Sequence, residues 1–187
     1  MASAQTRPVR IGLLGAGVVG QGILALLRDN ADTIAMRLGA AVEVRRVVAR
    51  DRARARDPLV AGARLSFDPA DVLDDPEVDV VVECMGGIEP AGTFVRAAID
   101  RGKQVVTANK ALLAEQGHEL IALAEDRHVD LYFEAAVAGG IPIIRVLREA
   151  LASDRIVALR GIVNGTSNYV LSRMDEDDLD FADALRD

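Results

Sequence analysis

Three glycines with the spacing G-x-G-x-x-G, Gly15, Gly17 and Gly20, directly follow a short apolar run. In this pattern the first glycine permits a tight turn, the second lets the backbone approach a pyrophosphate, and the third lets a helix pack closely on a strand. The start of that helix then offers unpaired N–H groups to the anion. The loop is therefore interpreted as a dinucleotide site, and the alternative is a glycine turn without a ligand.

A cluster of charges ends the next apolar run, where a dinucleotide-binding fold usually selects between NAD and NADP. Arg50 would suit a ribose 2′-phosphate, whereas Asp51 would suit a free 2′-hydroxyl. We favour NADP as the cofactor, with NAD tolerated. The alternative is a cluster of solvated surface charges.

Lys110 is informative because the chain has only two lysines beside twenty arginines. An ammonium can lose its proton, or place a compact charge where a guanidinium would not fit. Lys110 follows an apolar run that is expected to be a parallel strand, and ligands bind at the carboxyl ends of such strands. We predict a chemical role, against the alternative of a lysine that merely begins a helix. Lys103 is expected to be a solvated charge at a helix end.

Glu134 also follows an apolar strand, as does Glu83, and it precedes a glycine-rich loop whose carbonyl groups would be available. Oxygen ligands of this kind suit a hard cation. The alternative is an ordinary carboxylate at a strand end or helix cap. His118 and His128 have no spaced partner that would complete a catalytic triad, so both are expected on the surface.

The elements that would position these residues alternate along the chain. Apolar, β-branched runs predict strands, segments with a 3.6-residue period predict helices, and their alternation predicts a doubly wound parallel sheet of Rossmann type in residues 1–133. The expected strands are 9–14, 42–49, 78–84, 104–107 and 129–133, and the expected helices are 18–38, 68–74, 89–101 and 110–126. Residues 134–187 are expected to begin a second, α+β substrate and dimerisation domain, with helices from 142 to 151 and from 166, and a strand from 155 to 163.

Composition narrows the function classes. Of the formal charge of −7, the last thirteen residues carry −6, so the rest of the chain is nearly neutral; only 3% of residues are aromatic. Nucleic acid is therefore not an expected partner. A single cysteine and two histidines exclude an internal disulfide and a Cys/His zinc cluster. The apolar segment 11–27 is short and glycine-rich for a membrane span, and no signal peptide is recognisable. A cytoplasmic protein without membrane contact is expected.

Several longer motifs are specific to one family, and through them the chain resembles homoserine dehydrogenase. They occur in the family's order over residues 9–171 and read GLLGAGVVGQG, ECMGGIEPA, GKQVVTANKALLAEQG, FEAAVAGGIPIIRVLREAL and GIVNGTSNY. The first motif is common to many dinucleotide-binding enzymes. The others together separate the chain from enzymes such as aspartate-semialdehyde dehydrogenase.

The resemblance implies the NAD(P)-dependent interconversion of L-homoserine and L-aspartate 4-semialdehyde, with Lys110 at the active site. It also implies a monovalent cation such as sodium, a substrate pocket lined by the NGT motif, and a homodimer as the complete enzyme. The implied cofactor contacts are Gly15, Ala16, Gly17, Val18, Val19, Gly20, Arg50, Cys84 and Lys110. The implied cation ligands are Glu134 and the backbone of Val137, Gly139 and Ile141, and the implied substrate contacts are Gly165 and Thr166.

One departure from the family leaves two hypotheses open. The family continues into a Gly-Tyr-Ala-Glu segment and a lysine-containing segment taken to supply the general acid/base, and neither occurs in residues 1–187. The chain is expected to be the N-terminal portion of a monofunctional homoserine dehydrogenase, without a fused kinase. The alternative is a cofactor-binding module without catalytic activity.

Overall fold

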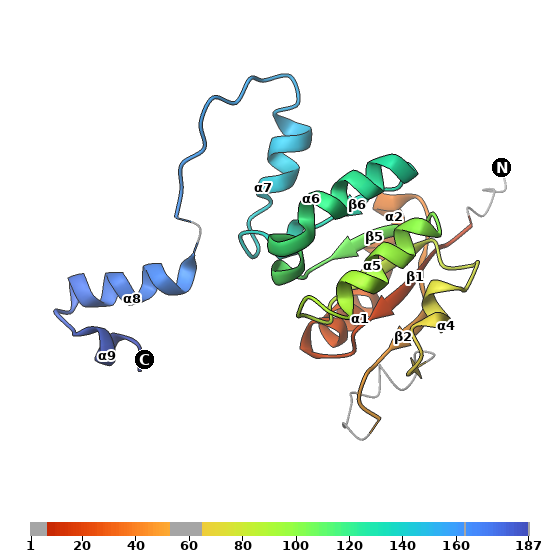
Figure 1. Cartoon of the computed structure of the whole chain (residues 1–187), viewed down its shortest axis with the longest axis horizontal. Coiled ribbons are helices and arrows are strands. Elements are labelled where there is room, and N and C mark those ends of the chain that lie inside the picture. The colour runs from red at the N-terminus through yellow and green to blue at the C-terminus, as the bar shows by residue number, and fades with distance from the viewer. Residues whose placement is uncertain (1–6, 53–64, 163, 187) are drawn as a thin grey trace. The chain divides into compact units, whose positions relative to one another are not determined.

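The computed structural model describes residues 7–52, 65–162 and 164–186 (Figure 1). The chain divides into two compact units, Met1–Val137 and Ala138–Asp187, and each is described by itself.

Six strands form one sheet within the described residues of the first unit. Their order is β3-β2-β1-β4-β5-β6 and every neighbouring pair is parallel. The strands are β1 (Val9–Leu14), β2 (Val42–Val48), β3 (Leu65–Ser66), β4 (Val80–Glu83), β5 (Gln104–Thr107) and β6 (Leu131–Tyr132). The chain therefore winds outward from β1 in one direction, then returns and winds outward in the other. This confirms the doubly wound parallel sheet.

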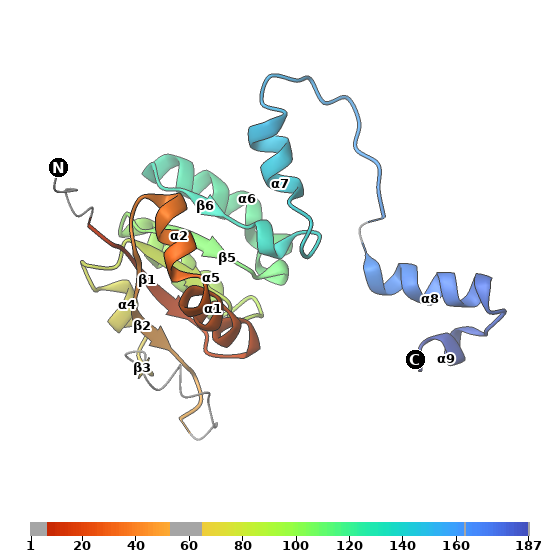
Figure 2. The ribbon, with the colours of Figure 1, turned by 180° about the vertical axis from the view of Figure 1, so that it is seen from behind.

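Helices cover both faces of this sheet. The helices α1 (Val18–Asp29) and α2 (Ala31–Leu38) connect β1 to β2 and are nearer the viewer in Figure 2. The opposite face carries α5 (Ala91–Asp100) and α6 (Lys110–Arg127), which are nearer the viewer in Figure 1, and the short α4 (Ala70–Leu73). Right-handed crossovers require this division when the winding direction reverses between β3 and β4.

Consecutive residues of β1 and β2 supply two separate cores. Leu13 and Val47 belong to the cluster beneath α1, whereas Leu14 and Val48 belong to the cluster beneath α4, α5 and α6. Because side chains alternate across a strand, a run of apolar residues is needed when both faces are covered. Each fully buried leucine contributes roughly 1.5–3 kcal/mol to folding. These cores hold the carboxyl ends of the strands in fixed register.

The predicted helix 18–38 is broken at one residue. Asn30 has φ −118° and ψ 18°, and both its backbone N–H and its side-chain amide donate to the Leu26 carbonyl, at 3.1 and 3.0 Å. An asparagine side chain competes in this way with the helical hydrogen-bond ladder. Gly39 then ends α2 with φ 76°, the left-handed conformation that was expected at this position.

The expectation for Lys103 is wrong. Its side chain is buried, and its ammonium donates to the carbonyls of Asp75 and Val78 at 2.6 and 2.9 Å. Burial lowers the pKa of this lysine, against the attraction of nearby aspartates. The segment before β4 folds over the start of β5, so a residue that follows a helix end lies beneath a loop instead of in solvent.

The second unit contains less regular structure than expected. The predicted helix 142–151 is a short α7 (Ile143–Arg145) that continues as a π-helix, η2 (Val146–Ala150). Residues 155–162 form no strand, and residue 163 lies outside the described residues. A strand needs a hydrogen-bonding partner, and no described segment of this unit supplies one; Val157 is accordingly 94% exposed and Ile162 76%.

Two helices complete this unit. The α8 helix (Gly165–Glu176) begins one residue earlier than expected because the Asn164 side chain accepts a hydrogen bond from the Ser167 N–H at 2.9 Å. It is followed by α9 (Phe181–Ala184). In the described part of the chain, no helix is long and apolar enough to cross a membrane.

Candidate cofactor-binding site

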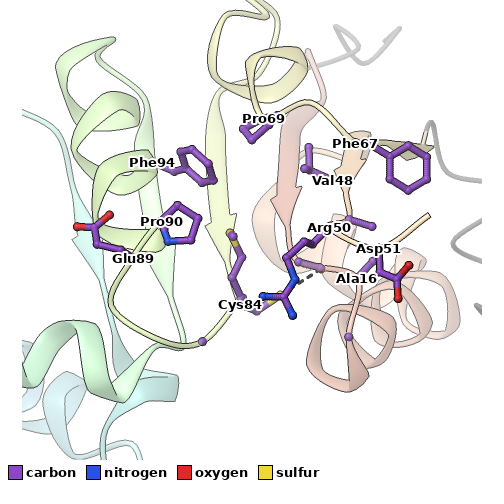
Figure 3. A pocket seen from close by; sticks show the side chains of 15 residues that line it. Ala16, Val48, Arg50, Asp51, Phe67, Pro69, Cys84, Glu89, Pro90 and Phe94 are labelled. Atoms are coloured by element: carbon purple, nitrogen blue, oxygen red, sulfur yellow. Dashed lines mark hydrogen bonds between the residues drawn. The ribbon is translucent and has the colours of Figure 1, made fainter. Parts of the chain in front are cut away.

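A pocket of about 390 Å³ opens at the carboxyl ends of β1, β2 and β4 (Figure 3). β1 lies between β2 and β4, so this is the point where the strand order reverses and where ligands bind in open α/β sheets. Its walls come from the loops that follow those three strands, from the segment that follows β3, and from the start of α5. They are Gly15, Ala16, Gly17, Val48, Ala49, Arg50, Asp51, Phe67, Pro69, Cys84, Met85, Gly86, Glu89, Pro90 and Phe94.

The three motif glycines are needed for different reasons. Gly15 has φ 118°, and a Cβ there would lie 2.8 Å from the Cys84 carbonyl oxygen. A Cβ on Gly20 would lie only 2.1 Å from the Gly15 carbonyl oxygen, so Gly20 lets α1 pack against the loop. At Gly17, by contrast, a Cβ would meet nothing within 4 Å. Gly15 and Gly20 therefore serve the fold, whereas Gly17 keeps space open in the pocket.

The start of α1 is suited to an anion. Gly17 is the N-cap residue, no side chain caps the helix, and the first turn contains no acidic residue. The next residues, Val18 and Val19, are 81% and 52% exposed. The N–H groups of this turn carry the positive end of the helix dipole, with no side-chain acceptor at the N-cap. These features fit the pyrophosphate of a dinucleotide cofactor.

Arg50 and Asp51 follow β2, and both line the pocket. Figure 3 shows that their side chains diverge: the Arg50 guanidinium extends across the pocket towards Cys84, and the Asp51 carboxylate points to the opposite side. The next residue, Arg52, stacks on Phe67 with 4.4 Å between its guanidinium carbon and the ring centroid. Arg50 is thus the cation that faces the pocket.

Cys84 forms part of the pocket floor. Its Sγ lies 3.3 Å from the Gly15 carbonyl oxygen and 3.6 Å from that of Leu14, and the thiol donates towards both. Burial, with a smaller contribution from the charge of Glu83, raises the pKa of the thiol to about 12. Because the thiolate is the nucleophilic form, Cys84 acts as a neutral packing group at neutral pH.

Lys110 lies at the same edge of the sheet, as the first residue of α6, and its side chain is exposed. It is not among the residues that line the pocket. The preceding residue, Asn109, caps the helix by accepting a hydrogen bond from the Leu112 N–H at 3.2 Å. The catalytic and cofactor-binding roles of Lys110 stay predictions. His118 and His128 are exposed, as expected.

Two sets of predicted residues lie outside this pocket. Glu134 and Val137 belong to the first unit, and Gly139 and Ile141 belong to the second, which is described by itself. Gly165 and Thr166 begin α8 in the second unit and are exposed. The cation and substrate sites stay predictions. No group of three His, Cys, Asp or Glu side chains suited to a metal occurs among the described residues.

Sequence reasoning missed the apolar walls and the burial of one carboxylate. The walls include Phe67, Pro69, Met85 and Phe94, which come from loops and from a helix start with no periodic pattern. The carboxylate is Glu83, which is fully buried. Its signal was present: Glu83 and Thr107 end neighbouring apolar strands and pair directly in the register of β4 and β5.

Comparison with known proteins identifies the family of both segments. Residues 15–134 match the family model described as "Homoserine dehydrogenase, NAD binding domain", and residues 142–187 match the model "Homoserine dehydrogenase". The homoserine dehydrogenase of Neisseria gonorrhoeae is 49% identical over 97% of this chain, and that of Bacillus subtilis is 41% identical over the same share.

Solved structures give the same result. The crystal structure of a homoserine dehydrogenase from Thiobacillus denitrificans has a TM-score of 0.90 and 50% identity over 97% of this chain. A hyperthermophilic archaeal homoserine dehydrogenase, solved in complex with NADPH, shares the fold with a TM-score of 0.78 at 24% identity, over 97% of this chain and 60% of its own. The chain spans 41–42% of the Neisseria, Bacillus and Thiobacillus proteins. The NAD-binding family model alone matches residues 15–134, more than half of the chain, and the chain therefore belongs to the homoserine dehydrogenase family.

Proposed function

We propose that the protein interconverts L-homoserine and L-aspartate 4-semialdehyde with a nicotinamide dinucleotide, NADP being preferred to NAD. In the oxidative direction, the C4–H bond of homoserine breaks with transfer of a hydride, the C4 hydroxyl loses its proton, and a carbonyl forms. NADP⁺, when bound, accepts the hydride and becomes NADPH. The family supports the reaction, and the pocket at the switch point supports the cofactor.

The described residues divide the work of binding and orientation. The loop that includes Gly17 and the start of α1 would hold the pyrophosphate, and Arg50 would contact the ribose 2′-phosphate. Lys110, at the same edge of the sheet, would place a positive charge near the substrate oxygen as negative charge develops on it. The apolar walls would exclude water and strengthen these interactions.

The observation that carries this proposal is the open space at Gly17. A glycine whose Cβ would clash with nothing, placed between two glycines whose Cβ atoms would clash with the backbone, is not explained by the packing of the fold. Because Gly17 also lines the pocket and begins α1, a ligand that approaches the backbone there would account for it.

The activity is tested by mixing the complete protein with L-homoserine and NADP⁺ and following NADPH fluorescence. Formation of NADPH that depends on L-homoserine, and that D-homoserine does not support, is the expected result. Repeating the assay with NAD⁺ ranks the two cofactors. A protein that binds NADPH but oxidises no homoserine would contradict the proposed reaction while leaving the cofactor site standing.

We further propose that residues 1–133 form the cofactor domain, that residues 134–187 begin the substrate domain, and that the complete enzyme is a homodimer. Glu134, with backbone oxygens of Val137, Gly139 and Ile141, would hold a monovalent cation such as sodium. Turnover should then fall when sodium is replaced by choline at constant ionic strength. In a Glu134→Gln variant the sodium concentration needed for half-maximal activity should rise. No dependence on sodium would contradict the cation site.

A further inference from the structure

We propose that Glu83 is a positioning residue, whose buried carboxylate fixes both the loop 85–87 in the cofactor pocket and the helix start that carries Lys110. The loop part of this inference needs only a cofactor site. The Lys110 part rests on the proposed function.

The carboxylate lies at the end of β4 and is fully buried. One oxygen, Oε2, accepts a hydrogen bond from the Thr107 hydroxyl at 2.6 Å, and the other, Oε1, accepts one from the Met85 N–H at 2.7 Å. Thr107 ends β5, whereas Met85 belongs to the loop that follows β4 and lines the pocket. The two oxygens therefore connect the neighbouring strand to the pocket wall.

Asn109 extends this connection to α6. Its side-chain amide donates to Glu83 Oε1 at 3.4 Å and to the Gly87 carbonyl at 2.6 Å, while its Oδ1 accepts from the Leu112 N–H at 3.2 Å. The Asn109 N–H in turn donates to the Thr107 hydroxyl oxygen at 3.1 Å. Hydrogen bonds thus fix both the backbone N–H and the side-chain amide of Asn109, and Lys110 is the next residue in the chain. A shift of Glu83 would therefore reach both the loop and Lys110.

Packing alone does not account for a carboxylate at this position. The other three residues of β4 are valines, and a buried carboxylate costs free energy that only good hydrogen bonds offset. An apolar pair across β4 and β5 would stabilise the sheet at least as well. It could not, however, hold the backbone N–H of Met85 and the amide of Asn109 in fixed directions. The hydrogen bonds of Glu83 converge on the edge of the sheet where the pocket lies, which points to a role in the site.

The Lys110 part is tested in the complete protein with a matched pair of variants. Thr107→Val removes the hydroxyl but keeps the shape, and Thr107→Ser restores the hydroxyl. Val105→Ala in the same strand is the control, since Val105 is equally buried but lies in the apolar core. Because small misplacements at an active site are costly, kcat for homoserine should fall about 10- to 100-fold in Thr107→Val. Thr107→Ser should recover most of it, and Val105→Ala should lower thermal stability without a comparable fall.

The loop part is tested by fluorescence titration with NADPH, which needs no turnover. A glutamine at position 83 cannot accept from all the donors around it, because its amide nitrogen is itself a donor. Glu83→Gln should therefore weaken NADPH binding about tenfold or more, because one charge-assisted hydrogen bond that orients the loop is lost. Val105→Ala should leave NADPH binding unchanged.

Two results would overturn the inference. The first is a kcat of Thr107→Val that matches Val105→Ala at equal loss of thermal stability, or that Thr107→Ser does not restore. The second is wild-type NADPH affinity in Glu83→Gln; if that variant does not fold, the Thr107 pair decides. If the unmodified protein binds NADPH but does not oxidise homoserine, the proposed function fails, and the NADPH titration still decides the role of Glu83.

Discussion

Replacing Gly17 by valine should separate cofactor binding from folding. The new side chain would enter space that the fold leaves empty, since a Cβ there meets no atom within 4 Å. The backbone is extended, with φ −80° and ψ −161°, so a β-branched residue adopts it without strain. The loss of glycine as N-cap should lower the free energy of unfolding by no more than about 1 kcal/mol. For a chain of this size that lowers Tm by about 2–4 °C.

The effect on NADPH should be much larger. The valine would hold the pyrophosphate away from the N–H groups at the start of α1, and each lost charge-assisted hydrogen bond is worth about 1.5–3 kcal/mol. Two such losses raise the Kd for NADPH at least about a hundredfold, because about 1.4 kcal/mol corresponds to a factor of ten. Fluorescence titration with NADPH measures this loss directly.

Two other glycines of α1 provide matched controls. Gly22 is exposed and also has open space around it, but it lies outside the pocket, so Gly22→Val should bind NADPH like the wild type. Gly20→Ala should show the opposite pattern from Gly17→Val, with a loss of stability of about 1–3 kcal/mol from overpacking against the Gly15 carbonyl. Unchanged NADPH affinity in Gly17→Val would refute the reasoning. So would a loss of stability as large as that of Gly20→Ala, because poor binding would then reflect a damaged fold.

Four further outcomes are expected. Arg50→Ala should weaken NADPH binding by about tenfold or more and NADH binding little, since only NADPH carries the 2′-phosphate; equal losses would show that Arg50 does not discriminate. Lys110→Ala should lower kcat while leaving Tm unchanged or slightly raised, because a lysine at a helix start opposes the helix dipole. Cys84 should react slowly with iodoacetamide at neutral pH, and the rate should rise only as the pH approaches the thiol pKa of about 12, unless unfolding exposes the thiol first. A polypeptide of residues 1–187 should bind NADPH but show negligible turnover with homoserine; robust turnover would indicate that Lys110 suffices as the base.

The sheet could be predicted because its signals are local and repeated. The strands β1, β2, β4, β5 and β6 appear as apolar or β-branched runs, and Gly39 and Asp68 mark a helix end and a helix start at the expected places. β3 has only two residues, Leu65 and Ser66, and such a segment cannot show a period of two. The prediction of a strand in the segment 155–162 was wrong for the opposite reason. Its apolar pattern is typical of a strand, but a strand also needs a partner, which local sequence does not report.

The pocket was predictable only in part, because its residues have different origins. The glycine loop is one continuous motif, so its position after β1 follows from the sequence. The apolar walls, by contrast, come from Phe67, Pro69 and Phe94, which only the winding of the sheet brings together. Glu83 and Thr107 are 24 residues apart, and they meet because β4 and β5 pair in a register that aligns their last residues.

The two lysines show where an argument from residue type succeeds and where it stops. The scarcity of lysine beside twenty arginines was the reason to predict a chemical role for Lys110. Lys103 fits this reasoning, although it was expected on the surface: its ammonium lies between the carbonyls of Asp75 and Val78, where the planar fork of a guanidinium would be harder to place. Lys110 is exposed at the edge where ligands bind, so there the same chemistry is available to a substrate. Residue type thus singled out Lys110 but not Lys103. Burial and hydrogen-bond partners show that Lys103 holds the fold, and the role of Lys110 towards a ligand stays a prediction.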